Sequence, residues 1–315
     1  MKLIIAFLRL VRWPNLVIIA VTQVLFYFSL VQPLFKKGIY TRFDNLHFIL
    51  LIIASVLIAA AGYIINDYFD LNIDQVNKPE RTIIDKAIKR RWAIVMHIVL
   101  SFTGVIISFY IDFNSPVFWL GTSNFICVFL LFGYSISLKK KLLWGNILIS
   151  ALTAWVVIVS FLCYFNSFYC SDCDRNFLEL YNTRFIRISF LYAAFAFVIS
   201  LIREVVKDME DMDGDSRYGG KTMPIAWGIP ASKVFVAVWL VVLIGMISVV
   251  QVYVLQFGWI WSTVYCISLI ILPLLWLLRK LFLAQSPKDY HQLSTVIKLV
   301  MVTGLLSMIF FKIYS

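Results

Sequence analysis

The chain has 315 residues, of which 62% are hydrophobic and only 14% are charged. A water-soluble protein of this length needs more polar surface, so the composition excludes a soluble globular fold and predicts a protein embedded in a membrane. The net charge of +11 would point to nucleic acid in a soluble protein. In a membrane protein, basic residues are typical of loops on the inner side, and we expect no nucleic-acid partner.

The N-terminal segment 1–12 is apolar apart from three basic residues, which predicts an interfacial helix that leads into the first membrane span. Apolar runs of about 20 residues follow it, long enough to cross the bilayer core as helices. These predicted spans are residues 15–35, 46–66, 92–112, 116–138, 143–165, 184–203, 233–254, 258–278 and 292–314. The pattern predicts one all-α domain over residues 1–315, a polytopic membrane bundle of about nine transmembrane helices.

Lysine and arginine are unevenly distributed over the segments that connect these spans. They concentrate in alternate segments, namely residues 1–14, 67–91, 139–142, 204–232 and 279–291. By the positive-inside rule these segments lie on the cytoplasmic side. We therefore expect an integral multi-pass protein of the cell (inner) membrane whose N-terminus is cytoplasmic.

The second predicted span is followed by a polar cluster that contains Asn66, Asp67, Asp70 and Asp74. A spacing of three and four residues places the three aspartates on one face of a helix, where their like charges repel one another. Hard oxygen ligands of this kind suit a Mg²⁺ ion, which would remove the repulsion. For this motif taken alone, acidic helix ends solvated by lipid headgroups are an equally reasonable explanation.

Two further motifs lie in the middle of the chain. Tyr134 and Lys139 end the fourth span, and they could reach an inner vestibule with the phenol near a reacting centre and the ammonium near a phosphate. An interfacial tyrosine beside snorkelling lysines is equally common, so both interpretations stay open. Cys170 and Cys173 predict a thiol pair or a local disulfide in a loop, because a single Cys-x-x-Cys is at most half of a zinc site.

The acidic motif recurs after the sixth span. Asp208, Asp211 and Asp215 each lie 141 residues after an aspartate of the first motif, and the predicted topology puts both motifs on the cytoplasmic side. Two such motifs can hold Mg²⁺ ions that bind a diphosphate and neutralise it as a leaving group, so that an allylic C–O bond ionises. The repetition argues against solvated helix ends.

Basic residues are interleaved with both acidic motifs. Arginine offers a planar fork for phosphate oxygens and lysine a mobile point charge, so Arg81 and Lys207 are candidate ligands of a diphosphate. The alternative is that these residues serve topology, since the positive-inside rule requires basic residues in these segments in any case.

Taken together, the motifs resemble the signatures of the UbiA superfamily of intramembrane prenyltransferases. The matching stretches, in chain order, are Arg12-Trp-Pro-Asn15, Asn66-Asp-x-x-Asp-x-x-x-Asp74, Asn77-Lys-Pro-x-Arg81, Tyr134-Ser-x-x-Leu-Lys139, Gly145-Asn146 and Lys207-Asp-x-x-Asp-x-x-x-Asp215. Several matches in the order of the family are far more specific than either acidic motif alone.

The resemblance implies two four-helix bundles and one further helix around a central cavity, which opens laterally for a long prenyl tail. It implies a transferase that ionises a prenyl diphosphate with Mg²⁺, after which an acceptor attacks the carbocation. The residues that it implies as Mg²⁺ ligands are Asn66, Asp67, Asp70, Asp74, Asp208, Asp211 and Asp215. The residues that it implies in catalysis are Asp67, Asp70, Asp208, Asp211 and Tyr134, and those at the diphosphate are Arg81, Lys139, Arg203 and Lys207.

Within the superfamily, the second motif and Thr222-Met-Pro-Ile225 are most similar to digeranylgeranylglyceryl phosphate synthases, which attach a geranylgeranyl group to a glycerol-phosphate ether lipid. The expected partners are therefore a prenyl diphosphate, a lipid acceptor and membrane lipids. After Arg81 the family commonly continues Pro-Ile-Pro-Ser-Gly, whereas this chain has Thr82-Ile-Ile-Asp-Lys86. The alternative is consequently an aromatic acceptor of quinone biosynthesis, such as 4-hydroxybenzoate or a naphthoate.

A protein of another class that uses acidic sites in a membrane is a cation transporter. Transporters place their coupling carboxylates near the middle of the membrane, often on broken helices. In this sequence the carboxylates follow the ends of the apolar runs, which favours the transferase.

Overall fold

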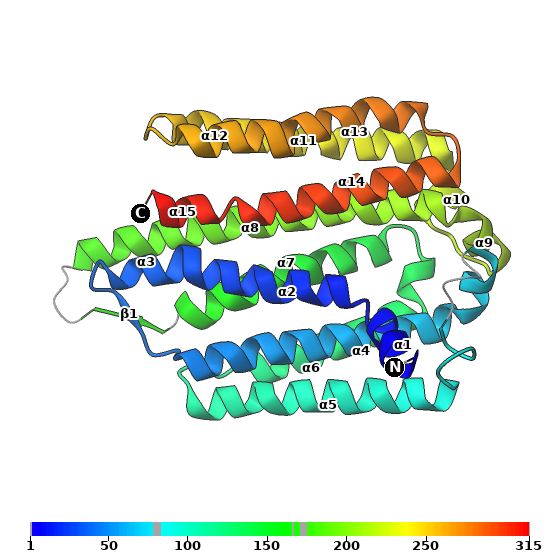
Figure 1. Cartoon of the computed structure of the whole chain (residues 1–315), viewed down its shortest axis with the longest axis horizontal. Helices are drawn as coiled ribbons and strands as arrows, with labels where there is room; N and C mark the ends of the chain where they lie inside the picture. Colours follow the sequence, from blue (N-terminus) through cyan, green and yellow to red (C-terminus); the bar gives the residue numbers. More distant parts are fainter. Residues whose placement is uncertain (1, 78–82, 166, 171–174, 315) are drawn as a thin grey trace. The chain divides into compact units, whose positions relative to one another are not determined.

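The computed structural model describes residues 2–77, 83–165, 167–170 and 175–314, and nearly all of its elements are helices (Figure 1). In chain order these are α1 (Lys2–Leu10), α2 (Trp13–Phe26), η1 (Tyr27–Val31), α3 (Gln32–Phe35), β1 (Tyr40–Thr41), α4 (Asn45–Asn77), α5 (Arg90–Asn114), α6 (Leu120–Ile136), η3 (Leu138–Lys140), α7 (Trp144–Phe165), β2 (Phe168–Tyr169), α8 (Arg175–Glu210), α9 (Met212–Arg217), α10 (Met223–Ala226), α11 (Gly228–Leu255), α12 (Ile260–Cys266), η4 (Ile267–Ile271), α13 (Leu272–Leu283), α14 (Pro287–Leu306) and α15 (Ile309–Ile313). Segment 1–12 contains the predicted helix as α1, and its place at the membrane interface stays a prediction.

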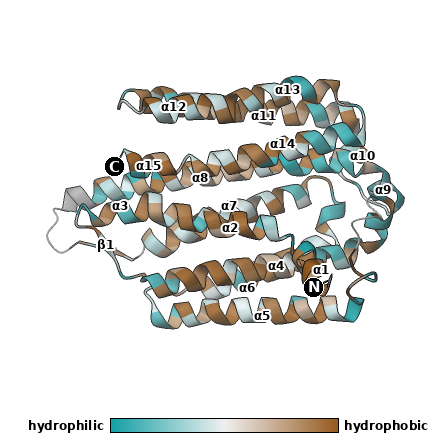
Figure 2. Cartoon of the chain, in the orientation of Figure 1, coloured by the Kyte–Doolittle hydropathy of each residue, from teal (hydrophilic) through white to brown (hydrophobic). Residues whose placement is uncertain are grey.

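Eight helical segments of the described chain are long and apolar enough to cross a membrane. They are Trp13–Phe35, Asn45–Asn77, Arg90–Asn114, Trp144–Phe165, Glu179–Glu210, Gly228–Leu255, Ile260–Leu283 and Pro287–Ile313. A ninth apolar helix, α6, has 17 residues and lies within the predicted span 116–138. Figure 2 shows hydrophobic residues along the length of the long helices. The prediction of an all-α polytopic membrane bundle is therefore confirmed, while the single domain and the central cavity stay predictions.

The chain folds as two compact units that are interleaved along the sequence. The first unit consists of Met1–Val24, Leu34–Lys139 and Val156–Arg187. The second unit consists of Leu25–Pro33, Lys140–Trp155 and Ile188–Ser315. The helices α2, α7 and α8 are continuous and contribute residues to both units.

In the first unit, α4, α5 and α6 pack against one another along their lengths (Figure 1). Glycines let their backbones approach closely. A Cβ atom at Gly104 of α5 would lie 2.8 Å from Ile58 of α4, and one at Gly62 of α4 would lie 2.9 Å from Leu131 of α6. Small residues are typical of such interfaces, because close van der Waals packing must replace the hydrophobic driving force that lipid cannot supply.

The helix α4 is longer than a membrane span requires. Its 33 residues extend over about 50 Å, whereas a bilayer core is about 30 Å thick. The helix continues beyond residue 66, where the predicted span ends, as far as Asn77. The carboxylates of Asp67, Asp70 and Asp74 therefore lie on one uninterrupted helix, as their spacing predicts.

In the second unit, α8, α11, α13 and α14 enclose a core of buried aliphatic side chains. The turn η4 between α12 and α13 is wider than an α-helical turn and ends two residues before Pro273. Proline has no N–H group, and its ring collides with the carbonyl four residues earlier, which belongs to Leu269. Thr303 of α14 donates its hydroxyl hydrogen to this carbonyl over 3.0 Å, which joins the two helices at the interruption.

Candidate active site

The first acidic motif lies in the first unit and forms a connected polar group. Arg12 Nη2 donates to Asp67 Oδ1 over 2.7 Å, and Lys139 Nζ forms an ion pair with Asp70 Oδ1. Asn66 Nδ2 donates to Asp70 Oδ2 over 2.8 Å. The side chains of Lys139 and Asp70 are 10% and 17% exposed, so this ion pair is largely shielded from solvent. Two segments that are distant in the sequence thus converge on the end of α4.

Arg12 reaches Asp67 because of the tight junction between α1 and α2. The residue has a φ of 51°, a left-handed conformation that is uncommon for a residue with a Cβ atom. The Arg12 N–H binds the Arg9 carbonyl over 3.0 Å, and the Arg12 carbonyl accepts from the Asn15 N–H over 2.8 Å. The guanidinium also lies over the ring of Tyr63, 5.2 Å from its centroid. Contacts on both sides hold the strained residue in place.

One polar atom in this group has no protein partner. Asn66 Oδ1 is buried and forms no hydrogen bond with any described residue. A buried amide oxygen without a partner costs about 1–3 kcal/mol, so it needs a compensating ligand. A carbonyl oxygen beside the carboxylates of Asp67 and Asp70 fits a hard cation such as Mg²⁺.

The second acidic motif lies in the second unit and has a different local structure. The helix α8 ends at Glu210 and α9 begins at Met212, so Asp211 occupies a break, with φ −98° and ψ 8°. The Asp211 N–H still binds the Lys207 carbonyl over 2.9 Å, and the Asp215 N–H binds the Asp211 carbonyl over 3.2 Å. The break is therefore a bend in a nearly continuous helix, and the second motif differs in this respect from the first, whose three aspartates lie on one regular helix.

Asp208 is held by a neutral side chain at the start of α7. Asn146 Nδ2 donates to Asp208 Oδ2 over 2.7 Å. The residue before α7, Leu143, has a φ of 52°, nearly that of Arg12 before α2. Both helices therefore begin with the same strained turn, and in each case a side chain at that start binds the first aspartate of a motif.

The loop after α9 closes on the second motif. The Gly220 N–H binds the Asp215 carbonyl over 2.8 Å, and a Cβ atom at Gly220 would lie 2.9 Å from the same oxygen. The next residue, Lys221, donates its N–H to the Lys140 carbonyl over 2.8 Å. This close approach requires a residue without a side chain at position 220.

The basic residues around the second motif share an acidic partner that sequence analysis missed. Glu204 binds Arg203 over 3.0 Å and Lys207 over 3.3 Å, and Glu204 is 9% exposed. In the described contacts, the two cations predicted at the diphosphate thus lie beside a buried carboxylate. Its position three residues before Lys207, one helical turn away, is the signal that could have revealed this pair.

The remaining predicted site residues have the following places. Tyr134 is near the end of α6, and Asp74 is on α4 one turn after Asp70. Arg81 lies outside the described residues. Within the part of the chain that the structure describes, no three His, Cys, Asp or Glu side chains come together closely enough to hold a metal ion by themselves.

The missed partners Arg12 and Asn146 lie inside stretches that the sequence had marked without giving these residues a role. Each belongs to a short motif at the start of a helix, and neither is close in sequence to the aspartate that it binds. The arrangement therefore provides oxygen ligands for a cation and basic donors for an anion, which is the donor set that a metal-bound phosphate compound requires.

Comparison with known proteins relates this arrangement to a family. A digeranylgeranylglyceryl phosphate synthase of Methanothermobacter thermautotrophicus is 32% identical over 263 residues, which are 82% of this chain and 83% of that protein. A protein of the same name from Methanosphaera stadtmanae is 28% identical over 250 residues, 78% of this chain and 81% of that protein.

Solved structures share the fold. A structure described as digeranylgeranylglyceryl phosphate synthase superposes with a TM-score of 0.64 at 22% identity and covers 98% of both chains. A UbiA homolog from Archaeoglobus fulgidus bound to DMAPP and Mg²⁺ has a TM-score of 0.56 at 13% identity, over 96% of this chain and 98% of that one. Residues 38–308 match the UbiA prenyltransferase family. The chain belongs to the UbiA prenyltransferase family, and it is an integral membrane prenyltransferase.

Proposed function

We propose that the chain transfers a geranylgeranyl group from its diphosphate to the ether lipid geranylgeranylglyceryl phosphate. The reaction class follows from the family to which the chain belongs. The acceptor is supported by the relatives of Methanothermobacter thermautotrophicus and Methanosphaera stadtmanae, which carry the name digeranylgeranylglyceryl phosphate synthase and are similar over most of this chain.

Mg²⁺ is the cofactor in this proposal, and a UbiA homolog of known structure bound to GPP and Mg²⁺ supports it. The buried Asn66 Oδ1, which has no described protein partner, fits such an ion. The residues that would hold the ions are Asn66, Asp67, Asp70, Asp74, Asp208, Asp211 and Asp215. When bound, Mg²⁺ would neutralise the diphosphate as it leaves the allylic carbon.

The basic residues would bind and orient the diphosphate. An ammonium group has three donors, and Asp70 uses one of those on Lys139, so the others are available to phosphate oxygens. Arg12 donates to Asp67 through Nη2 and has further N–H donors on its guanidinium. Arg203 and Lys207 are held by Glu204 and are expected to present their free donors in the same way.

The observation that carries the proposal is the group formed by Asn66, Asp67, Asp70 and Lys139. Carboxylate and amide oxygens for a cation lie beside a shielded ammonium for an anion, all in one unit of the fold. Tyr134 lies two residues before the end of α6, the helix that leads to Lys139, and we place its phenol at the reacting carbon. The second motif repeats the spacing in the other unit and has its own polar partners, so in this proposal it holds Mg²⁺ as well.

The acceptor is tested directly by product analysis. Purified protein is incubated with Mg²⁺, prenyl diphosphates of different lengths, and either geranylgeranylglyceryl phosphate, 4-hydroxybenzoate or a naphthoate. We expect mass spectrometry to find the digeranylgeranyl ether lipid as the main product. Prenylated hydroxybenzoate or naphthoate as the sole product would reject the glyceryl lipid and favour a quinone pathway.

The orientation in the membrane is part of the proposal, with the N-terminus and both acidic motifs on the cytoplasmic side. Cys170 is disulfide-bonded and follows β2, which pairs antiparallel with β1 just before α4. Cys173 lies outside the described residues. Structural disulfides persist in oxidising compartments, so this end of α4 belongs outside the cytoplasm. Asp67 lies 22 residues further along α4 than Asn45, about 33 Å away and thus on the other side of a bilayer core.

A labelling experiment distinguishes the two orientations. Intact cells are reduced mildly and treated with a membrane-impermeant maleimide, and peptide mass spectrometry locates the label. We expect Cys170 to be labelled without permeabilisation. Labelling of Cys170 only after the membrane has been opened would reverse the orientation.

A further inference from the structure

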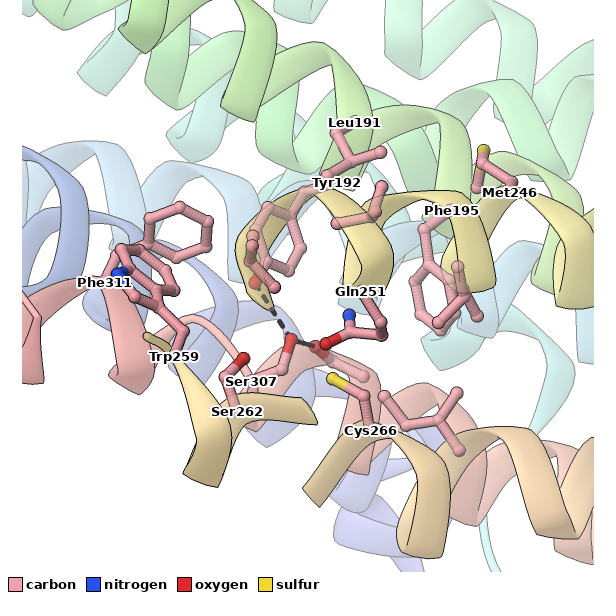
Figure 3. A pocket seen from close by; sticks show the side chains of 15 residues that line it. Leu191, Tyr192, Phe195, Met246, Gln251, Trp259, Ser262, Cys266, Ser307 and Phe311 are labelled. Atoms are coloured by element: carbon pink, nitrogen blue, oxygen red, sulfur yellow. Dashed lines mark hydrogen bonds between the residues drawn. The ribbon is translucent and has the colours of Figure 1, made fainter. Parts of the chain in front are cut away.

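The second unit contains a cavity of about 70 Å³ to which the proposed function assigns no role (Figure 3). It lies among α8, α11, α12, α14 and α15, and all of its lining residues belong to the second unit. Tyr192 of α8 lines it, whereas Asp208 is 16 residues further along the same helix, about 24 Å away. The cavity is therefore at the opposite end of this unit from the acidic motif.

The cavity is lined mainly by apolar and aromatic side chains. Phe195, Met246, Ile247 and Ile270 form its deeper part, and none of its lining residues is charged. A volume of about 70 Å³ exceeds what one water molecule needs, about 10–15 Å³, and each water would also need two to four polar partners. The lining thus favours part of an apolar chain over a group of water molecules.

One polar side chain reaches into this apolar space without a partner. Gln251 of α11 is 7% exposed, and its Oε1 forms no hydrogen bond with any described residue. In Figure 3 its amide extends toward Ser307 and Cys266. A polar side chain in a membrane helix is costly unless it is paired, so its presence points to a ligand. The missing partner must offer a hydrogen to Oε1.

Two other polar side chains at the cavity, Tyr192 and Ser307, bind each other. Tyr192 Oη lies 2.9 Å from Ser307 Oγ, and Ser307 Oγ donates to the Gly304 carbonyl over 2.6 Å. Ser307 therefore accepts from Tyr192. A Cβ atom at Gly304 would lie 2.4 Å from the ring of Phe195, so the glycine leaves room for that ring in the wall of the cavity. Among the described lining residues, Gln251 is thus the one with a buried side-chain polar atom that has no hydrogen-bond partner.

The depth of Gln251 indicates the kind of molecule that fits. Gln251 is four residues before the end of α11 at Leu255, about 6 Å along the axis. Trp259, four residues after the end of α11, also lines the cavity, and tryptophan is typical of the membrane–water interface. Gln251 therefore lies where the hydroxyl and glycerol groups of lipids reside, with the apolar part of the cavity deeper in the membrane.

We propose that this cavity binds a neutral lipid alcohol, whose hydroxyl group pairs with Gln251 and whose hydrocarbon chain packs against Phe195 and Ile270. A hydroxyl group can donate to Oε1 and accept from Nε2 of the same amide. The uncharged lining excludes a phosphate or carboxylate head, which would be buried without a cation. Free prenyl alcohols and dialkylglycerols share this chemistry, and either one is a possible source.

The wide turn η4 contributes to the shape of the cavity. Cys266 directly precedes this interruption and Ile270 lies within it, and both line the cavity just before Pro273. Such single wide turns often occur at functional sites because they redirect side chains that a regular helix would point elsewhere. The irregular turn that precedes Pro273 therefore lies at the wall of the cavity.

Photolabelling of the full-length protein in lipid nanodiscs tests the proposal. A diazirine-bearing hexadecanol is the probe, peptide mass spectrometry maps the label, and unlabelled geranylgeraniol or a dialkylglycerol competes. We expect label on the segments around Gln251 and Ile270, and competition by at least one of the two alcohols identifies its source. Hexadecyl phosphate, which has the same chain and a charged head, should compete at least about tenfold more weakly.

Two variants of α11 separate recognition from folding. Gln251→Leu removes the amide at similar volume. It should raise about tenfold the concentration of unlabelled alcohol that is needed to halve the labelling. Gln256→Leu replaces an exposed glutamine just after the same helix, outside the cavity lining, and should leave labelling unchanged. Prenyl transfer should be unchanged in both variants, so failure of this proposal is distinguishable from failure of the proposed function.

Three results would overturn the proposal. One is equal labelling of the cavity in Gln251→Leu and the unaltered protein. Another is competition by hexadecyl phosphate as strong as that by the alcohols. The third is the absence of saturable label at the cavity, which would leave water as its occupant.

Discussion

The two acidic motifs have the same spacing along the chain but differ in local structure and in partners. In the first unit, Asp67 and Asp70 lie on one uninterrupted helix and bind two cations, Arg12 and Lys139. In the second unit, the helix bends at the middle aspartate, and Asp208 accepts a hydrogen bond from a neutral amide. Equal spacing therefore does not imply equal surroundings.

This difference has a chemical consequence for a site that is to bind cations. A carboxylate that binds a lysine or arginine has part of its charge neutralised before any ion arrives. A carboxylate that accepts a hydrogen bond from an asparagine is oriented by a neutral group instead of a cation. We infer that in the first motif the phosphate ligand pairs directly with a metal-binding carboxylate, whereas in the second motif the basic residues pair with Glu204 instead.

The largest expected effect tests whether both motifs are required. Asp70→Asn and Asp208→Asn each remove one charge at nearly constant volume, and each should lower the rate of prenyl transfer at least about hundredfold. The measurement is the initial rate at saturating Mg²⁺ and prenyl diphosphate. Asp213→Asn is the matched control, because Asp213 is an exposed acid between the second and third aspartates of the second motif. Full activity in either motif variant would show that one motif is dispensable.

The next effect tests whether the first motif also binds phosphate. Lys139→Met removes the shielded ammonium beside Asp70 and should lower the rate about thirtyfold, with a weaker apparent affinity for the prenyl diphosphate. Lys140→Met is the neighbouring control, since that ammonium contacts the Tyr218 carbonyl over 3.4 Å. Equal losses in the two variants would mean that Lys139 acts only through the general positive charge of this segment.

A smaller effect compares the two partners of the first aspartates. Asn146→Ala leaves a buried oxygen of Asp208 without its donor and should lower the free energy of unfolding by about 2 kcal/mol. Arg12→Ala breaks an ion pair whose arginine is 37% exposed, so solvent screening limits the loss to about 1 kcal/mol. Urea unfolding in mixed micelles measures both values. A larger loss for Arg12→Ala would reverse the ranking of the two partners.

The smallest effect concerns the loop that closes on the second motif. Gly220→Ala must displace the Asp215 carbonyl, which lies 2.9 Å from the added carbon, and should cost about 1 kcal/mol of stability and a few-fold in rate. Gly133→Ala is the control, because that glycine is inside α6 with open space around it. The control should be neutral or slightly stabilising, since alanine favours a helix. Unchanged stability and rate in Gly220→Ala would show that the loop adapts freely.

Part of the site was predictable because it depends on local periodicity. The spacing of Asp67, Asp70 and Asp74 predicts one helical face, and α4 has that form. The spacing argument does not hold at Asp211, because the helix bends there between α8 and α9. Spacing reports the phase of a regular helix, but it carries no information on whether the helix continues.

The partners of the aspartates were not predictable from spacing. Arg12 is 55 residues from Asp67, Lys139 is 69 residues from Asp70, and Asn146 is 62 residues from Asp208. Such pairs form only after separate helices have packed. The sequence marked all three as parts of short motifs, yet their pairing depends on the tight turns at the starts of α2 and α7.

The sequence by itself determined that this protein is a membrane-embedded helical prenyltransferase of recognisable family, because apolar length and motif spacing are local properties of a chain. The tertiary structure decided which cation binds which carboxylate, that Asn66 keeps a free oxygen, and that Gln251 faces an apolar cavity. These features arise from helix packing and from interruptions such as the one before Pro273. No periodicity in the sequence encodes them.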